Sequence, residues 1–307
     1  MFISEDRPVT ISKDAFLLTL LCLIAVTVLV NCTNPISSNG GNASFTFTVA
    51  DVGQGLAQFG VMDGRAVLWD MGPPSQYPAW RGAYNSLGRP RIEMIVISHF
   101  DNDHYGGLQH LDENTEWSGA IAVSPVEDTA GIRSVAAAEW RNRINFHVYA
   151  AGDTLKVFGN VEIICLWPPR DTDPELPLNS RDKNRYSMVF SVRHGHSRAL
   201  VTSDIDYEAM NAITLHSAHN LRAQILSAPH HGSAGSVHPL FFAYVSADAA
   251  IISCSRQNTH GHPSRQMVDE LTYQGTRLFY TYLDHSVTFT SNGHYWQYSS
   301  ANNYSQN

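Results

Sequence analysis

One stretch of the chain, residues 95–107, constrains its fold and chemistry more than any other. It reads I-V-I-S-H-F-D-N-D-H-Y-G-G and begins as a short β-branched apolar run, which is typical of a buried strand. Four residues of metal-ligand type then fall within six positions, before two glycines that allow a close turn: His99, Asp101, Asp103 and His104. Imidazole suits zinc and iron, whereas carboxylate suits manganese and magnesium, so the loop predicts a site for a pair of divalent cations. The alternative, an ordinary polar loop, is disfavoured because four such residues gather at one strand end.

Composition limits the class of protein. The chain has 307 residues, of which 43% are hydrophobic and 16% charged, enough apolar residues for a substantial core in one large domain or two smaller ones. Its formal charge of −8 is the wrong sign for a protein that grips nucleic acid over its whole surface, although a local basic groove stays open. Four scattered cysteines predict neither a disulfide framework nor a zinc ribbon, and Cys165 and Cys254 are expected as buried free thiols.

The N-terminal region is expected to lie outside the folded domain. Residues 15–30 are apolar apart from two threonines, short for a spanning helix but adequate for a signal-peptide core or a short anchor. We therefore assign residues 1–32 to a signal or membrane anchor and residues 33–44 to a flexible linker. Lipidation at Cys32 is a minority alternative, because Asn31 is a poor residue before a lipoprotein cleavage site. The protein is expected to be membrane-anchored or exported, with the periplasmic or extracytoplasmic side favoured, although the charges flanking the apolar segment do not fix its orientation.

From residue 45 onward, short strands and helices alternate in two successive halves. This order favours one layered α/β domain over residues 45–292, with a tail at 293–307. Helices are expected over residues 132–143 and 207–216, and a hairpin is expected around Gly195. Residues 73–91, which hold four prolines, and residues 171–183 are expected as loops.

Further ligand-type residues follow other apolar runs. Asp204 follows the run at 199–201, and the pair His230–His231 follows the run at 225–228. A lone aspartate at a strand end also serves as a helix cap, which is the alternative for Asp204. His262, in a Gly-His-Pro sequence, is as readily an ordinary loop histidine as a site residue.

Taken together, these motifs resemble the metallo-β-lactamase fold. The resemblance rests on S-H-F-D-N-D-H-Y-G-G, Asp204, A-P-H-H-G-S and G-H-P, with D-V-G-Q-G and W-D-M-G earlier in the chain. More narrowly, it is to the C-terminal hydrolase domain of ComEC-type DNA-uptake (competence) proteins. It implies a four-layer αβ/βα sandwich, preceded here by the one N-terminal hydrophobic segment, with two metals at an edge between the sheets.

The resemblance also implies roles, residue by residue. His99 and Asp101 would hold the first metal; Asp103, His104 and His230 would hold the second; Asp204 would bridge the two. Asp70 would accept a hydrogen bond that orients a ligand histidine. Catalytic roles would fall to Asp103, His231 and His262, and Ser233 would contact the substrate.

Two departures from the wider fold narrow the resemblance. Many members carry histidine where this chain has Asp101, and they have a further ligand histidine where this chain reads Asn184 to Ser187. Both features favour the ComEC-like branch over a β-lactamase. The chain has one hydrophobic segment where the ComEC-type protein is a multi-helix channel, so a role in DNA uptake cannot be inherited.

The chemistry of such a site predicts a function. Two divalent ions, zinc or manganese, would share a water whose pKa falls from about 15.7 toward ~7, giving a metal-bridging hydroxide. Three carboxylates against four positive charges leave roughly +1, which favours an anionic substrate. The leading hypothesis is a phosphodiesterase or nuclease whose partner is a phosphodiester, DNA among them, with the membrane contacted through the N-terminal segment. The alternatives are a cell-envelope phosphoester hydrolase of the phosphorylcholine-esterase type and a metal-binding domain without turnover.

Overall fold

The computed structural model describes residues 43–171 and 180–300 of the chain. The predicted anchor, nearly all of the predicted linker and residues 301–307 lie outside this part, as does most of the loop expected at 171–183. Within the described residues, no helix combines the length and apolar character needed to cross a membrane. Cys165 and Cys254 are buried free thiols, as predicted.

Two β-sheets form the centre of the domain. The first sheet has the strand order β15-β14-β1-β2-β3-β4-β5-β6. Its strands are β1 (Phe45–Val49), β2 (Ala57–Met62), β3 (Arg65–Met71), β4 (Arg91–Val96), β5 (Ala120–Val123), β6 (Asn145–Val148), β14 (Val287–Ser291) and β15 (Trp296–Ser300). The strands from β3 to β6 are parallel and the rest of the sheet is antiparallel.

The second sheet has the strand order β13-β12-β11-β10-β9-β8-β7. Its strands are β7 (Thr154–Leu155), β8 (Val161–Trp167), β9 (Val189–His194), β10 (Ser197–Val201), β11 (Ile225–Ser227), β12 (Ala249–Ile252) and β13 (Arg277–Tyr280). Strands β10 to β13 are parallel, whereas β9 and β10 form the predicted hairpin around Gly195.

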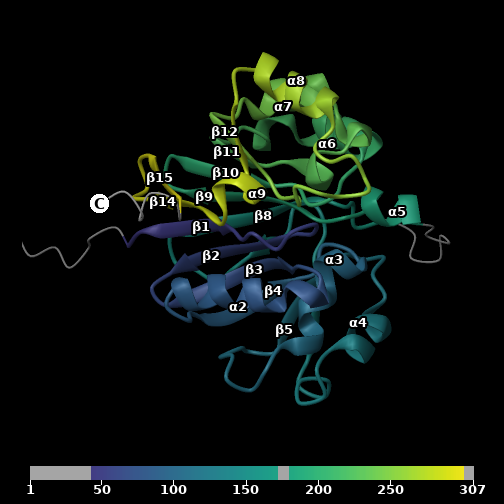
Figure 1. Cartoon of the computed structure of the whole chain (residues 1–307), viewed down its shortest axis with the longest axis vertical. Helices are drawn as coiled ribbons and strands as arrows, with labels where there is room; N and C mark the ends of the chain where they lie inside the picture. The colour runs from purple at the N-terminus through teal and green to yellow at the C-terminus, as the bar shows by residue number, and fades with distance from the viewer. Residues whose placement is uncertain (1–42, 172–179, 301–307) are drawn as a thin grey trace, which may run out of the picture. The chain divides into compact units, whose positions relative to one another are not determined.

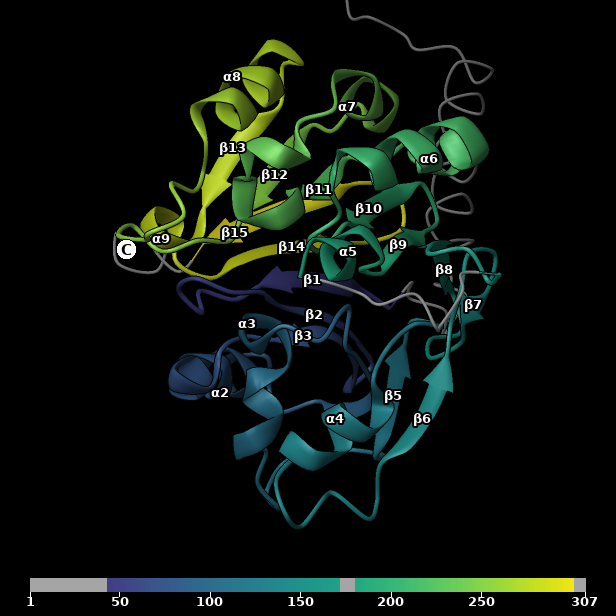
Figure 2. The same ribbon diagram turned by 90° about the vertical axis from the view of Figure 1, so that its right-hand side faces the viewer.

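Helices cover the outer face of each sheet (Figures 1 and 2). On the first sheet lie α2 (Tyr77–Ser86), α3 (Asn102–Tyr105) and α4 (Thr129–Val135); on the second lie α6 (Tyr207–Ser217), α7 (Pro239–Val245) and α8 (Arg265–Tyr273). The remaining helices are α5 (Ser180–Arg185) and α9 (Thr281–Asp284). Three buried apolar clusters separate these layers, one between the two sheets and one under each set of helices. The domain is therefore an α/β fold, as the alternation of strands and helices predicts, and it has the four layers that the resemblance implies.

Sequence and structure differ at four places. The loop expected over residues 171–183 ends in a helix, α5, whose last turn carries Lys183 and Arg185, the charge that suits a helix C-terminus. The helix expected over 132–143 is shorter and earlier, because Ala136 is extended and Arg133 donates to the carbonyl oxygens of Arg141 and Ile144, which folds the rest into turns. Residues 77–86, expected as loop, form α2, since Pro78 sits in the first turn, where its missing N–H costs nothing. The boundary predicted at residue 292 is too early, because β15 pairs with β14 beyond it.

The two sheets place several parallel strand ends at one edge of the domain. Asp70 lies in β3 near its end, and residues 98–104 follow β4. From the second sheet, Ser203 and Asp204 follow β10, His230 and His231 follow β11, and Ser253 follows β12. Ligand sites in sheets of this kind form outside the carboxyl ends of the strands, so the topology brings the predicted residues together.

Candidate metal centre

The loop after β4 packs against the first sheet more closely than any side chain would allow. A Cβ on Gly107 would lie 2.5 Å from the carbonyl oxygen of Met71, and one on Gly106 would lie 2.2 Å from Cδ of Pro74. Neither glycine has a left-handed backbone, so close packing, rather than a special turn, explains their presence. This contact fixes the position of the short helix α3, which carries Asp103 and His104.

His104 is held from behind by a buried carboxylate. Its Nδ1 lies 2.7 Å from Asp70 Oδ2, and both side chains are fully buried. Asp70 also accepts hydrogen bonds from the Ser98 backbone N–H and hydroxyl, so both of its oxygens are occupied. The Ser98 hydroxyl in turn lies 3.0 Å from His99 Nδ1 and accepts a hydrogen bond from Ser203. Asp70 thus orients the imidazole of His104 directly and, through Ser98, that of His99.

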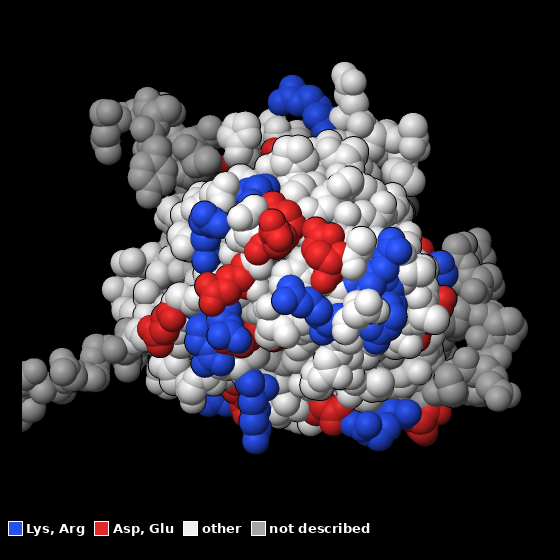
Figure 3. Space-filling view, turned by 90° about the horizontal axis from the view of Figure 1, so that it is seen from below, with Lys and Arg blue, Asp and Glu red and all other residues white. Residues whose placement is uncertain are grey.

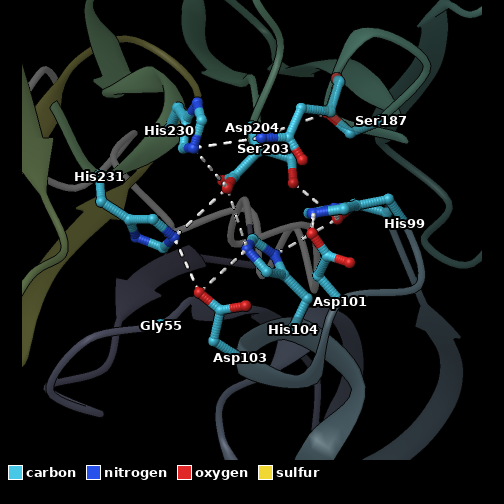
Figure 4. A network of polar contacts seen from close by, with 12 residues as sticks. Gly55, His99, Asp101, Asp103, His104, Ser187, Ser203, Asp204, His230 and His231 are labelled. Carbon is cyan, nitrogen blue, oxygen red and sulfur yellow. Dashed lines mark hydrogen bonds and ion pairs between the residues drawn. The ribbon is translucent and has the colours of Figure 1, made fainter. Parts of the chain in front are cut away.

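Asp204 projects from the second sheet into the same space. Its side chain is 5% exposed and its backbone N–H donates to the hydroxyl of Ser187, which sits in the segment where other members of the fold place a histidine. Asp204 Oδ2 lies 3.3 Å from His104 Nε2 and 3.5 Å from His231 Nε2. The carboxylate therefore stands between histidines contributed by the two sheets (Figure 4).

The paired histidines adopt an unusual backbone. His230 has φ of 50° and His231 has φ of 55°, both in the left-handed region, and Ser203 (45°) and Asp70 (61°) share it. Such a conformation costs a non-glycine residue about 1–3 kcal/mol and is found where surrounding structure enforces it, often at functional sites. Here it sends the two rings to different places. His231 Nδ1 lies 2.9 Å from the Ser253 carbonyl oxygen and its Nε2 faces Asp103 and Asp204, whereas His230 Nε2 lies 3.2 Å from Asn184 Nδ2.

This arrangement differs from the roles that the resemblance implies for the pair. His231, expected on the substrate side, lies 3.5 Å from both Asp103 Oδ2 and Asp204 Oδ2 and is 3% exposed. His230, expected as the ligand, is 26% exposed and lies 3.6 Å from Asp204 Oδ2. The left-handed turn places the second histidine, rather than the first, among the other ligand atoms.

The polar atoms at the centre are placed to bind a cation rather than to form hydrogen bonds with one another. Nε2 of His99, His104 and His231 and Oδ1 of Asp204 are buried and have no hydrogen-bond partner within the described residues. Two ligands each about 2.1 Å from a tetrahedral metal would be separated by about 3.4 Å. The contacts of His104 and His231 with Asp103 and Asp204 span 3.3–3.9 Å, so these four residues form one cage of the right size. Each ring is also held at Nδ1, as is usual for ligand histidines.

A second group of ligand atoms adjoins this cage. His99, His104 and Asp204 offer ligand atoms within 4.8 Å of one another, and His99 Nε2 lies 3.5 Å from Asp101 Oδ2. The other oxygen of Asp101 lies 3.3 Å from Lys183 Nζ, a cation that the sequence analysis did not assign to the site. The residues present could therefore hold two ions that share Asp204.

The electrostatics show how strongly the site attracts positive charge. Burial alone would lower the pKa of His104, but the carboxylates of Asp204, Asp70 and Asp103 outweigh it and raise that pKa well above the usual value. Burial would also lower the pKa of His231, but the carboxylates of Asp204 and Asp103 raise it to about 9. Burial would raise the pKa of Asp204, yet His104, His231 and His230 hold it well below its usual value. Without a metal, protons occupy the histidine nitrogens to which cations would bind.

The remaining predicted residues line the rim. Gln54 Nε2 lies 3.3 Å from His262 Nδ1, and the His262 ring lies 5.6 Å from that of His230 and 6.2 Å from that of His231. Ser233 lines a cavity of about 410 Å³ with His230 and Asn184, while its hydroxyl accepts a hydrogen bond from the Gly235 N–H. All the predicted residues thus lie in or beside one centre. Sequence reasoning assigned no role to Ser98, Ser253, Gln54 and Lys183. Two of them stand in motifs quoted above, Ser98 in S-H-F-D-N-D-H-Y-G-G and Gln54 in D-V-G-Q-G.

Comparison with known proteins agrees with this fold and centre. Residues 58–128, which include β3, β4 and the first ligand loop, match the model of the metallo-beta-lactamase superfamily. Among solved structures, the metallo-beta-lactamase fold protein YhfI from Bacillus subtilis aligns with a TM-score of 0.52 at 11% identity, covering 80% of this chain and 100% of its own. The domain therefore has the metallo-β-lactamase fold, with a centre of histidine and aspartate side chains that could hold metal.

The curated relatives are more specific. Competence protein ComA of Neisseria gonorrhoeae is 28% identical over 245 residues, 79% of this chain and 32% of the relative. ComE operon protein 3 of Bacillus subtilis (strain 168) is 24% identical over 249 residues, 75% of this chain and 31% of the relative. Recombination protein 2 of Haemophilus influenzae is 27% identical over 234 residues, 72% of this chain and 26% of the relative. The predicted resemblance to ComEC-type competence proteins is confirmed, and the chain spans a third or less of the length of these relatives.

Proposed function

We propose that this domain is a metal-dependent phosphodiesterase that uses two divalent ions, zinc or manganese, and acts on nucleic acid. The observation that carries the proposal is the convergence of four buried atoms without hydrogen-bond partners in the described structure, contributed by His99, His104, His231 and Asp204. Burying polar atoms unpaired is costly, so their common orientation supports a site built for cations. We assign His99, Asp101 and Asp204 to one ion and Asp103, His104, His231 and Asp204 to the other.

The chemistry divides between the ions and the chain. Two bound divalent ions would supply an activated water and would neutralise charge that builds up on a phosphoryl group. The chain holds this arrangement through Asp70, which fixes His104 and, through Ser98, His99. Asp204 lies between the ligands from both sheets and so sets their spacing.

His262 is suited to orient a substrate oxygen. Burial and the nearby His231, His230 and His260 lower the pKa of His262 to about 4, so its ring is neutral at pH 7. Gln54 Oε1 accepts from the Ser255 N–H and its amide nitrogen faces His262 Nδ1, which leaves the proton on Nε2. His262 then offers a neutral N–H donor on the open side of the centre, beside His230.

Two considerations favour a phosphodiester and nucleic acid. Two divalent ions and the Lys183 ammonium would face four carboxylates, those of Asp70, Asp101, Asp103 and Asp204. Roughly one positive charge remains at the centre before a hydroxide binds, and it attracts an anion. The relatives carry competence and recombination names, which associates them with DNA. The face seen in Figure 3 carries basic and acidic residues intermixed, so any contact with nucleic acid would be local to the centre rather than spread over this face.

A substrate panel with defined metals tests the proposal. The protein, freed of metal and reloaded with Mn²⁺ or Zn²⁺, should hydrolyse bis-p-nitrophenyl phosphate and degrade single-stranded DNA. Asp103→Asn keeps the shape of the side chain but removes a charged ligand, and it should lower both activities by roughly 100-fold or more, because misplaced ions misalign the reacting groups. Hydrolysis of p-nitrophenylphosphorylcholine alone would favour the cell-envelope alternative. Two bound ions without hydrolysis of any phosphoester would favour a metal-binding domain.

A further inference from the structure

A polar loop borders the centre on the side of His262. It comprises residues 255–262 and follows β12 by two residues. The side chain of Asn258 closes it: Nδ2 donates to the carbonyl oxygens of Ser255 and His262, and Oδ1 accepts from the N–H groups of His260 and His262. Four hydrogen bonds from one carboxamide give this loop a fixed shape, so the groups on its surface are held in place before any ligand arrives.

The loop lines a cavity of about 610 Å³ together with Gln54. Arg256 and His260 are its charged or titratable members, and no acidic residue lines it. The guanidinium of Arg256 lies 5.8 Å from the centre of the Tyr282 ring and forms no ion pair with any described residue. Arg185, in the cavity on the other side of His230, contrasts with it, because Asp206 lies 3.1 Å and Glu208 3.3 Å from that guanidinium. Of these two cavities beside the centre, only the one with Arg256 carries an unneutralised arginine.

This cavity is joined to the centre through Gln54. One end of the Gln54 amide contacts the Ser255 N–H at the cavity and the other contacts His262 Nδ1 at 3.3 Å. His262 in turn adjoins His230 and His231, with ring centres 5.6 and 6.2 Å away. A nucleic-acid strand whose scissile phosphate lay at the centre would place its next phosphate past His262, toward Arg256, on one side. On the other side it would meet the cavity that carries Asp206 and Glu208.

We infer that the Arg256 cavity is a subsite for the phosphate next to the scissile one, and that the domain therefore prefers a polymeric or terminally phosphorylated nucleic acid over an isolated phosphodiester. This inference rests on the proposed function. Arg256 supplies a charge-assisted hydrogen bond to the neighbouring phosphate, with His260 beside it in the lining of the cavity. The opposite cavity, with Asp206 and Glu208, repels a second phosphate, so the strand is bound asymmetrically.

A matched pair of dinucleotides isolates the extra phosphate. Thymidylyl-thymidine has only the scissile phosphodiester, whereas the same dinucleotide phosphorylated at both ends offers a neighbour on either side. With Mn²⁺ present, the wild-type protein should have a higher kcat/KM for the phosphorylated substrate. Arg256→Ala should lower the ratio of the two kcat/KM values about tenfold, the effect of losing one charge-assisted hydrogen bond. Arg256→Lys should restore part of the ratio. The control is Arg193→Ala. Arg193 is an exposed arginine at the turn end of the β9–β10 hairpin, away from the end at which Asp204 lies, and its removal should leave the ratio unchanged.

Binding provides a readout that does not need turnover. In an Asp103→Asn background with Mn²⁺, a fluorescent ten-residue oligothymidylate should bind with an affinity that falls as salt rises. Adding Arg256→Ala should reduce the slope of log K against log salt by about 0.7, the contribution of one phosphate contact on a single strand. An unchanged slope together with an unchanged substrate ratio would overturn the subsite. If no phosphodiester is hydrolysed by the wild-type protein, the proposed function fails, while the slope still decides whether Arg256 binds phosphate.

Discussion

Asp70 Oδ2 lies 2.7 Å from His104 Nδ1, and neither side chain is accessible to solvent. The aspartate also has a left-handed backbone, with φ of 61°, which asparagine tolerates as well as aspartate does. Asp70→Asn should therefore keep the local fold while removing the charge that orients His104. We expect metal affinity to fall about 10–100-fold, measured by competition with a fluorescent chelator.

The metal-free form provides the control for Asp70→Asn. Its circular dichroism spectrum should remain that of a folded protein, while its thermal transition should fall below that of the metal-free wild-type protein, because the protonated His104 loses a buried carboxylate partner. Unchanged metal affinity in a folded variant would mean that Asp70 serves only to satisfy buried hydrogen bonds.

The two adjacent histidines should differ in their contribution to metal binding. His231→Ala removes a ring that is 3% exposed and faces Asp103 and Asp204, and it should lower the content from two ions to about one after equilibrium dialysis. His230→Ala removes a partly exposed ring whose Nε2 faces Asn184, and it should retain both ions. Elemental analysis by mass spectrometry distinguishes the variants. The reverse pattern would restore the assignment made from sequence.

The contribution of His238 to stability should fall as the pH drops. Its Nδ1 accepts a hydrogen bond from the Phe241 N–H at the start of α7, and burial lowers the pKa of His238 in the folded state. In the unfolded chain this histidine has its usual pKa of about 6.5, so below that pH the unfolded state binds more protons than the folded state. The stability that His238 contributes is therefore present at neutral pH and is lost as the pH falls toward 5. Urea denaturation of the metal-free protein at pH 7 and pH 5 measures the loss.

Asparagine is the matched replacement at this position. His238→Asn keeps a side-chain acceptor that caps α7 but does not titrate, so the loss of stability between pH 7 and pH 5 should be smaller than in the wild-type protein. Parallel pH profiles for the two proteins would show that protonation of His238 is not coupled to folding.

Metal removal should weaken the connection between the two sheets. His99, Asp103 and His104 come from the loop after β4, whereas Asp204 and His231 come from the ends of β10 and β11. Ions bound between them stabilise only the folded state, each by about 2.7 kcal/mol when free metal exceeds Kd a hundredfold. The melting temperature measured by calorimetry should therefore rise with metal concentration and be lowest in EDTA. A melting temperature insensitive to metal would indicate that the cage is not completed in solution.

The sequence was sufficient for some parts of this centre and insufficient for others, for physical reasons. The ligand loop at residues 99–104 could be recognised because its members are contiguous, and Asp204 because it follows an apolar strand. The sequence analysis gave the ligand role to His230, whereas the structure turns His231 toward the cage, because the outcome depends on two left-handed residues that no local pattern requires.

The supporting contacts were beyond the sequence for another reason. Ser98 and Ser253 act through a hydroxyl and a backbone carbonyl, groups that occur throughout the chain and become informative only when the sheets assemble. Helix α2 was missed because proline was taken as a breaker, whereas Pro78 lies in a first turn that accommodates it. The layered architecture needed only the alternation of apolar runs and was predicted correctly.

The packing beneath the centre also sets its dimensions. Trp69 immediately precedes Asp70 in β3, and its ring lies 6.4 Å from that of Phe190 in β9, across the interior between the sheets. These aromatic rings act as a spacer that determines how far the β4 loop stands from Asp204. A smaller residue at position 190 would let the sheets approach, so a genetic screen for inactive variants should recover hydrophobic positions that never touch a substrate.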